Sequence, residues 1–447
     1  MTMQIQDLGI RFDFSRARMT AGEWETLYEL AAKRNAAGFL EDAVRGEIVN
    51  TDEKRQALHT SLRTEDADAP HFEDVRSTLS RVFARAAEVR QTVRCGAITD
   101  IVNIGIGGSS LGPEVLWHAF CDEVPGLRMH FLTASDPVLF KRICREVEPK
   151  KTLVVVSSKS MRTRETLINA RAFLDFLLDK GVSAAALQAR TFCVSANPQA
   201  PGLWGVPSEN AFEMFEWVVG RFSVWSAISL PVVFAFGEDF FKAFLDGARR
   251  ADAVALETKP ESNPALRLAL LAYRQLELGM IDHCLLPYDE RLRKLPYWLE
   301  QLEMESLGKC RDNHGEKIDA PTSQLLWTVM ADEGQHSVYQ FLREINHACA
   351  LTVFSVKPEG ADAFATYQRL NTKAQIEALC RKENAHANAL LHIALDSLTP
   401  RTLGYLMATY EAKTVMLAAL YGVNPFHQPA VELGKRLLNA FYEAGEA

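Results

Sequence analysis

The sequence of 447 residues has little cysteine, and the eight cysteines form no recognisable site. They are scattered, without a Cys-x-x-Cys pair or a zinc-ligand spacing, so free, buried thiols of a reducing compartment are expected. Long apolar runs are also missing. The most apolar stretch, residues 227–236, is short and contains Pro231, which argues against a membrane span. The N-terminus lacks the apolar core of a signal peptide, so we expect a cytoplasmic protein.

An excess of basic residues is absent as well. Lysine and arginine together number 49 against 57 aspartates and glutamates, which gives a formal net charge of −8. This balance argues against nucleic acid as the main partner, but local donors can still bind a small anion. The hydrophobic fraction of 48% is typical of a chain with large cores, and the length favours two or three domains.

Strand and helix patterns alternate from about residue 70. A predicted helix over 72–93 precedes four short apolar runs, which helical stretches separate. These runs lie at residues 101–106, 127–134, 153–157 and 191–195. Such alternation predicts a doubly wound parallel sheet. After about residue 240 the chain is mostly helical, and a strand predicted over 350–356 indicates a second α/β domain.

The N-terminal 65 residues are predicted to be largely helical. Residues 23–38 have the spacing of an amphipathic helix, and Thr51 has the position of an N-cap before a run of helix-forming residues.

A glycine-serine cluster follows the first apolar run. Gly105, Gly107 and Gly108 allow the backbone to turn sharply and approach a ligand, and Ser109 can cap the next helix or donate to an anion. The third glycine of the dinucleotide fingerprint is replaced by Ser110, and no Gly-Lys-Ser/Thr follows. Because backbone N–H groups converge where a strand turns into a helix, the cluster predicts a phosphate cradle. The alternative is a plain strand-to-helix turn.

The third apolar run ends in a second set of donors. Ser158, Ser160, Thr163 and Thr166 supply hydroxyls, and Lys159 supplies a charge. The carboxyl ends of neighbouring strands meet at one crevice in a doubly wound sheet, so both clusters are expected to hold one phosphate. An ordinary helix N-terminus rich in serine and threonine is the alternative.

Two charged residues fall on apolar helix faces. Glu305 shares a face with Trp298, Leu302 and Lys309, which suits a general base, although a simple Glu305–Lys309 ion pair is the alternative. Glu300 and Glu303 are predicted to point elsewhere.

Lys435 shares a face with Val431, Leu438 and Tyr442, while Arg436 is spaced to pair with Glu432. Lys435 is therefore either a proton or anion donor or a lysine that covers the edge of the core.

His336 and Arg221 give weaker signals. His336 has no metal-ligand spacing to other histidines, which leaves a structural histidine as the alternative. Arg221 lies between aromatic runs, where it would pair with a carboxylate, phosphate or enolate, or stack on a ring.

Together these motifs resemble those of the glucose-6-phosphate isomerase (phosphoglucose isomerase) family over residues 47 to 440. The matching stretches are IGIGGSSLGP, SKSMRTRET, FEWVVGRFSVWSAISLP, LPYDERLRKLPYWLEQLEMESLGK, EGQHSVYQF and VNPFHQPAVELGKRL. The resemblance implies an α/β fold of two sugar-isomerase (SIS) type doubly wound domains with surrounding helices, a homodimer, a small sugar phosphate as the ligand, and no metal or redox cofactor.

The resemblance implies that the chain has four parts. They are an N-terminal helical segment (1–65) packing on the second domain, a first SIS-type domain with the phosphate loops (66–235), a second with the catalytic glutamate (236–425), and a C-terminal helix with the catalytic lysine (426–447).

The resemblance also implies roles by position. Glu305 would carry a proton between C1 and C2 of the sugar, and Arg221 would stabilise the cis-enediolate. His336, from the neighbouring subunit, and Lys435 would assist ring opening, with Gln301 and Gln428 near the sugar. The residues that would line the phosphate site are Gly108, Ser109, Ser158, Lys159, Ser160, Thr163 and Thr166. The implied activity is the reversible isomerisation of glucose 6-phosphate and fructose 6-phosphate.

Some positions depart from the family pattern, and the chain is shorter than its long members. The departures are Arg162, Val219, Leu307, Asp332, Glu333 and His427. Two acids beside an anionic substrate are unexpected, which leaves open an isomerase of another C6-anionic hexose, such as a sulfonated sugar. A catalytically weak sugar-phosphate sensor is a third hypothesis, which the intact set of catalytic residues disfavours.

Overall fold

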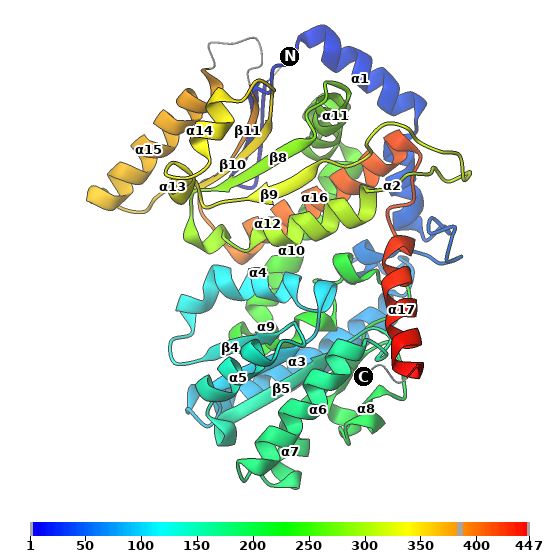
Figure 1. Cartoon of the computed structure of the whole chain (residues 1–447), viewed down its shortest axis with the longest axis vertical. Helices are drawn as coiled ribbons and strands as arrows, with labels where there is room; N and C mark the ends of the chain where they lie inside the picture. Colours follow the sequence, from blue (N-terminus) through cyan, green and yellow to red (C-terminus); the bar gives the residue numbers. More distant parts are fainter. Residues whose placement is uncertain (1–2, 382–387, 445–447) are drawn as a thin grey trace.

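Two sheets organise the chain in the computed structural model, which describes residues 3–381 and 388–444 (Figure 1). The first has five strands in the order β4-β3-β5-β6-β7, and every neighbouring pair is parallel. Its strands are β3 (Asp100–Ile104), β4 (Arg128–Leu132), β5 (Thr152–Ser157), β6 (Thr191–Ser195) and β7 (Ala211–Glu213). The four strands predicted in this region are confirmed; β7 was not predicted.

Helices cover both faces of the first sheet, as a doubly wound fold requires. They are α3 (Phe72–Arg94), α4 (Leu111–Phe120), α5 (Pro137–Glu146), α6 (Arg164–Asp179), α7 (Ala184–Arg190), α8 (Ala200–Leu203) and α9 (Leu230–Phe236). Strand β5 is buried along its whole length. Leu153 and Val155 join the core on one face, while Val154 and Val156 join the core on the other, because successive side chains of a strand alternate. This explains why β5 appears in the sequence as a continuous apolar run.

The second sheet is mixed. Its order is β1-β2-β11-β10-β8-β9, in which β11, β10, β8 and β9 are parallel and the β1-β2 hairpin is antiparallel. The bounds are β1 (Gln4–Asp7), β2 (Ile10–Arg16), β8 (Asp282–Pro287), β9 (Leu325–Thr328), β10 (Ala350–Val356) and β11 (Ala389–Leu395). Only β10 was predicted. The expectation of a helical N-terminal segment is wrong for residues 4–16, which form the hairpin at the edge of this sheet.

The remaining helices range in length from 4 to 22 residues. They are α1 (Ala21–Lys33), α2 (Ala36–Arg45), α10 (Glu238–Glu257), α11 (Pro264–Glu277), α12 (Leu295–Glu300), α13 (Ala331–Gly334), α14 (Tyr339–Glu344), α15 (Ala363–Cys380), α16 (Pro400–Tyr421) and α17 (Glu432–Glu443). The helix predicted from Thr51 is absent: turns follow Thr51, and only residues 59–62 form a 3₁₀ turn. The helix predicted over 23–38 is two helices, because Asn35 adopts a left-handed conformation with φ of 52°.

Helix α16 lies at the centre of the molecule, and 18 of its 22 residues are buried. It crosses α10 so closely that a Cβ at Gly404 would lie 2.0 Å from the carbonyl oxygen of Phe244. The helix nevertheless carries two charges into the core. Glu411 accepts from Arg63 at 2.7 Å and from the indole of Trp225, while Lys413 pairs with Glu303. Burial raises the pKa of Glu411 to about 7.

Two further observations concern the cysteines and the membrane. All eight cysteines are free, but Cys95 and Cys310 are exposed, so burial was wrongly expected for these two. None of the helices among residues 3–381 and 388–444 has the length and apolar composition to cross a membrane.

The buried Lys413–Glu303 pair gives a test of this core. Lys413→Met should lower the free energy of unfolding by about 3–5 kcal/mol, because it leaves an uncompensated buried carboxylate. The double variant Lys413→Met/Glu303→Leu should recover most of that loss. Denaturant titration followed by far-UV circular dichroism measures both, and equal destabilisation by the single and the double variant would contradict the pairing.

Candidate active site

A pocket of about 640 Å³ opens at the carboxyl ends of the strands of the first sheet. Its walls come from the loops after β3, β5, β6 and β7, from the start of α6, and from residues of α17 and the segment before it. The predicted site residues that line it are Gly108, Ser109, Ser158, Lys159, Ser160, Thr163, Thr166, Gln428 and Lys435. Ser109 and Ser158 are 49 residues apart in the chain. The two glycine- and hydroxyl-rich segments that contain them therefore face one cavity.

The glycine loop is held against a second loop by close backbone contact. Gly107 has φ of +59°, and a Cβ at Gly108 would lie 2.1 Å from the carbonyl oxygen of Gly220. Ser223 also donates to the Gly108 carbonyl at 3.2 Å. The side chain of Ser109 does not cap α4, since Ser110 is the N-cap residue and makes no side-chain cap bond. Glycine is thus required at Gly108 for packing, and Ser109 faces the pocket.

The hydroxyls after β5 are only partly satisfied by the protein. Ser158 Oγ accepts from the Met161 amide and Ser160 Oγ from the Arg162 amide, both at 3.2 Å. Ser157 Oγ and Thr166 Oγ1 are buried and have no hydrogen-bond partner among the described residues. Buried hydroxyls are normally paired, so these two are suited to a ligand.

Lys159 and Arg162, two cations of the pocket, differ in whether their side chains already have partners in the protein. Lys159 Nζ donates to the carbonyl oxygens of Glu216 and Val218 at 2.6 and 2.9 Å, and burial lowers the pKa of this lysine. Arg162 is exposed, and its guanidinium makes no ion pair or hydrogen bond with the described part of the chain. The guanidinium of Arg162 is therefore available to an anion in the pocket.

Arg221 lies behind the pocket wall and is 3% exposed. Its Nε donates to Ser306 Oγ at 2.6 Å, and one terminal nitrogen donates to Gln428 Oε1 at 3.0 Å. The same nitrogen lies 3.4 Å from Glu305 Oε2, and the other donates to the carbonyl of Pro425. Burial lowers the pKa of Arg221 to about 10, against the opposing effect of Glu305. Arg221 thus pairs with a carboxylate and also lies over the ring of Phe222 at 5.7 Å, so both of the alternatives given for it are observed.

Glu305 ends a π-helical turn, residues 301–305, that continues α12. Such turns are rare and recur at functional sites. The alternative of a Glu305–Lys309 ion pair is wrong, because Lys309 Nζ donates instead to the carbonyls of Glu305 and His427 at 2.8 and 2.7 Å. Burial and the nearby Arg221 lower the pKa of Lys309 to about 8. The expectation that Glu303 points away from the core is also wrong, since it is buried against Lys413.

Gln301 connects the π-helical turn to the glycine loop. Its Nε2 lies 2.9 Å from the position that a Cβ of Gly107 would take, and its Oε1 is buried without a partner among the residues described. Glu305, Arg221 and Gln301 do not line the pocket themselves, but each contacts a segment that does.

Lys435 lines the pocket from α17, which buries none of its residues. The predicted Glu432–Arg436 pair is not formed; Lys435 Nζ lies 2.6 Å from Glu432 Oε1 instead. The alternative of a lysine at the core edge is therefore wrong as well. The helix is held to α6 by Arg164, which donates to Asn439 at 3.0 Å and lies over the ring of Tyr442.

His336 is exposed and does not line the pocket of its own chain. It follows α13, and Figure 1 shows α13 and α17 at opposite sides of the molecule. The structure thus brings together every other predicted site residue, but not this one.

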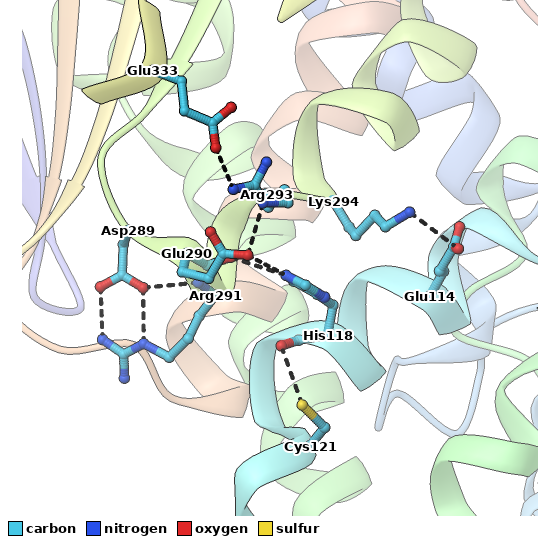
Figure 2. A network of polar contacts seen from close by, with 9 residues as sticks. All are labelled: Glu114, His118, Cys121, Asp289, Glu290, Arg291, Arg293, Lys294 and Glu333. Carbon is cyan, nitrogen blue, oxygen red and sulfur yellow. Dashed lines mark hydrogen bonds and ion pairs between the residues drawn. The ribbon is translucent and has the colours of Figure 1, made fainter. Parts of the chain in front are cut away.

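The two unexpected acids beside His336 have local partners. Glu333 pairs with Arg293 at 2.9 Å, and Asp332 accepts from Asn371 at 2.7 Å. Figure 2 shows that Arg293 also holds Glu290, which in turn contacts His118 on α4. Glu333 is therefore part of a polar network between the two halves of the chain, and neither acid lines the pocket of its own chain.

Three other departures are explained by the structure only in part. Val219 lines the pocket, and Leu307 is buried in the core. The carbonyl of His427 accepts from Lys309 and Arg221, and its imidazole Nε2 lies 3.6 Å from Asp52 Oδ2.

Besides Ser157 and Arg162, the sequence analysis gave no role in the site to four further residues. Glu53 and Arg55 line the pocket from the N-terminal segment, Glu216 pairs with Arg55 at 3.0 Å, and Ser306 accepts from Arg221. Glu216 and Ser306 lie in stretches that carry the resemblance, but nothing in the residue pattern gave them a role of their own.

The family model for phosphoglucose isomerase matches residues 13–386 and 366–446. The chain belongs to the phosphoglucose isomerase family. It is 35% identical over 459 residues to glucose-6-phosphate isomerase of Burkholderia lata, covering 96% of this chain and 85% of that protein. It is therefore shorter than this relative, as expected.

Solved structures agree with this family. A glucose-6-phosphate isomerase from Chlamydia trachomatis superposes with a TM-score of 0.90 at 27% identity, covering 99% of this chain and 90% of that one. A Bacillus subtilis protein that has been provisionally assigned as a phosphosugar isomerase shares the fold. Its structure superposes with a TM-score of 0.50 at 14% identity, covering 80% of this chain and 98% of that one. The expected SIS-type α/β architecture is confirmed.

The contact at Gly108 gives a test of the pocket. Gly108→Ala should weaken the binding of inorganic phosphate at least tenfold, because the new Cβ would collide with the Gly220 carbonyl and displace the loop. Calorimetric titration measures the effect. Gly202→Ala, at a glycine with open space around it, is the matched control and should bind as the native protein does. Equal affinity of both variants would contradict the role of this loop.

Proposed function

We propose that the protein interconverts glucose 6-phosphate and fructose 6-phosphate, in glycolysis or gluconeogenesis in the cytoplasm. The observation that carries the proposal is the Arg221–Glu305 contact of 3.4 Å directly behind a pocket rich in anion donors. A phosphate grip and a carboxylate–guanidinium pair are the two parts that an aldose–ketose isomerase of a sugar phosphate needs. The 35% identity to the glucose-6-phosphate isomerase of Burkholderia lata supports the same activity.

In the proposed reaction the phosphate binds between the glycine loop and the segment after β5. The hydroxyls of Ser109, Ser158 and Thr166 and the charge of Arg162 hold it, which fixes the sugar against the other wall. Glu305 removes a proton from one of the carbons C1 and C2 and returns it to the other. The enediolate that forms carries negative charge, and Arg221 stabilises it.

Ring opening needs a proton donor and an acceptor around the ring oxygen and the C1 hydroxyl. We assign these roles to Lys435 and to His336, with Gln301 and Gln428 orienting the sugar. Because His336 is distant from the pocket of its own chain, it would reach the site of a second copy in a homodimer.

Asp332 and Glu333 were the reason for considering another C6-anionic hexose as the substrate. Arg293 and Asn371 engage these acids, so they no longer argue for a different substrate. The free guanidinium of Arg162 favours a doubly charged phosphate over a singly charged sulfonate. The sensor hypothesis has no observation in its favour.

Glu305→Gln tests the mechanism. It should reduce kcat by about 10²–10⁴-fold or more with little change in KM, because the amide cannot accept the proton. Coupled assays in both directions measure the rates. Glu300→Gln, on the same helix, is the control and should retain the native rate. Full activity of Glu305→Gln would exclude this carboxylate as the base.

Arg162→Thr tests the phosphate grip. It should raise KM for fructose 6-phosphate roughly tenfold, equivalent to about 1.4 kcal/mol, and leave kcat nearly unchanged. The activity on a C6-sulfonated hexose should fall less. If the sulfonated sugar is the better substrate of the native protein, the proposed substrate is wrong.

Mixed dimers test the assignment of His336. Dimers of His336→Ala and dimers of Glu305→Gln should each be almost inactive. After the two are unfolded and refolded together, activity should return to roughly a quarter of the native value, because each mixed dimer contains one site without a substitution. No return of activity, with mixed dimers detected by mass spectrometry, would place both residues in the site of one chain.

A further inference from the structure

A second cavity, of about 440 Å³, opens at the carboxyl ends of β10 and β11 in the other sheet. Helix α15 and the β1-β2 hairpin supply its remaining walls. It has no lining residue in common with the pocket of the first sheet. In open α/β folds the carboxyl ends of the strands are where ligands bind, so the position is that of a binding site.

Four cations without partners line this cavity. They are Arg11 of β2, Lys357 after β10, and Arg369 and Lys373 of α15. Their side chains make no ion pair or hydrogen bond within residues 3–381 and 388–444. A fifth cation, Arg16, is paired with Glu377.

The carboxylates of the cavity leave this charge largely uncompensated. Asp13 accepts from the Ser15 amide and from Gln4 at 2.9 and 2.8 Å, and Glu377 is engaged by Arg16. Asp13 and Asp396 make no ion pair in the described ranges, so the four unpaired cations exceed the unpaired acids of the lining by two. Arg369 and Lys373 are four residues apart on one helix, where like charges repel. An anion between them would remove this repulsion.

Unpaired cations are not a general property of cavities in this chain. The cavity between α3 and α10, of about 640 Å³, has cations of similar number. There Lys242 pairs with Glu238 at 2.6 Å and Arg249 with Glu65 at 2.7 Å, while Arg63 is held by Asp252. Of the cations that line this cavity, only Arg76 makes no ion pair with a described residue, and it lies over the ring of Phe72.

Inside the cavity lies a neutral hydrogen-bonding pair. Ser355 Oγ of β10 and His392 Nε2 of β11 are 2.8 Å apart. Burial, together with the charges of Arg11 and Arg16, lowers the pKa of His392 to about 4, so its ring is neutral at neutral pH. In either tautomer of the neutral imidazole, one proton of the pair is used in this bond, and the one remaining N–H or O–H can donate to a bound oxygen without adding charge.

The end of β10 repeats a feature of the first pocket. There β5 ends in Ser157 and Lys159 follows two residues later; here Ser355 is near the end of β10 and Lys357 follows two residues later. In both sheets a buried parallel strand thus brings a hydroxyl and a lysine to a cavity at its carboxyl end.

We propose that this cavity is a second anion site, which binds a small organic phosphate between Arg11, Lys357, Arg369 and Lys373, over the Ser355–His392 pair. The site is additional to the proposed isomerase pocket and does not depend on its activity.

Inorganic pyrophosphate is the probe for the test. Proton–carbon NMR of the chain labelled with ¹³C-histidine, with the His392 signal assigned through His392→Gln, should show a saturable shift of that signal. The variant Arg369→Gln/Lys373→Gln should weaken this binding at least tenfold. Both side chains are exposed and distant from the first pocket, so isomerase activity should stay at the native level.

Lys141→Gln/Arg142→Gln is the matched control, since it removes two exposed helix cations elsewhere. It should bind pyrophosphate at His392 as the native chain does. An unchanged His392 signal, or equal weakening by both double variants, would overturn the proposal. Tighter binding of citrate than of pyrophosphate would overturn its assignment to phosphates.

Discussion

A single buried guanidinium determines how the candidate active site is assembled. Arg221 is removed from water, so its N–H groups need protein acceptors, and these come from separate parts of the chain. Ser306 and Glu305 follow α12 of the second half, while Pro425 and Gln428 precede α17. Meeting the hydrogen-bonding requirement of Arg221 therefore brings the π-helical turn and the C-terminal segment to the loop beside Gly108. The same charge that organises these segments is the one that the proposed enediolate needs.

The first sheet could be predicted because its strands are buried on both faces. Continuous apolar runs such as β5 have no other stable position, and glycines and hydroxyls follow them where the loops meet a ligand. The N-terminal hairpin could not be found in this way. Residues 4–7 are short and half-exposed, and the hairpin is fixed by pairing with β11, almost 380 residues later in the chain. Strands β8, β9 and β11 likewise lacked a pattern distinct from the helices around them.

The candidate site was predictable to the extent that its chemistry depends on residue type. Hydroxyl donors beside a glycine turn and a carboxylate on an apolar helix face indicate this chemistry, although each also left a structural alternative that the residues alone did not exclude. The partners of these groups were not predictable, because they depend on tertiary distance. Lys309 was spaced to pair with Glu305 and instead binds two carbonyls, and Glu303 was expected outside the core but meets Lys413 there. Helical spacing shows which side chains can meet, and the packing of other elements selects among them.

Helix α17 carries Lys435 to the pocket and yet buries none of its own residues. The position of this helix thus adds little to the stability of the rest of the fold. Local unfolding of α17 requires less free energy than local unfolding of α16. The free energy that orders Lys435 must then come mainly from whatever fills the pocket or covers the apolar side of α17. The affinity for a ligand of the pocket would include the cost of ordering this helix, so residues of α17 that do not contact the ligand would influence how tightly it is held and how quickly it leaves.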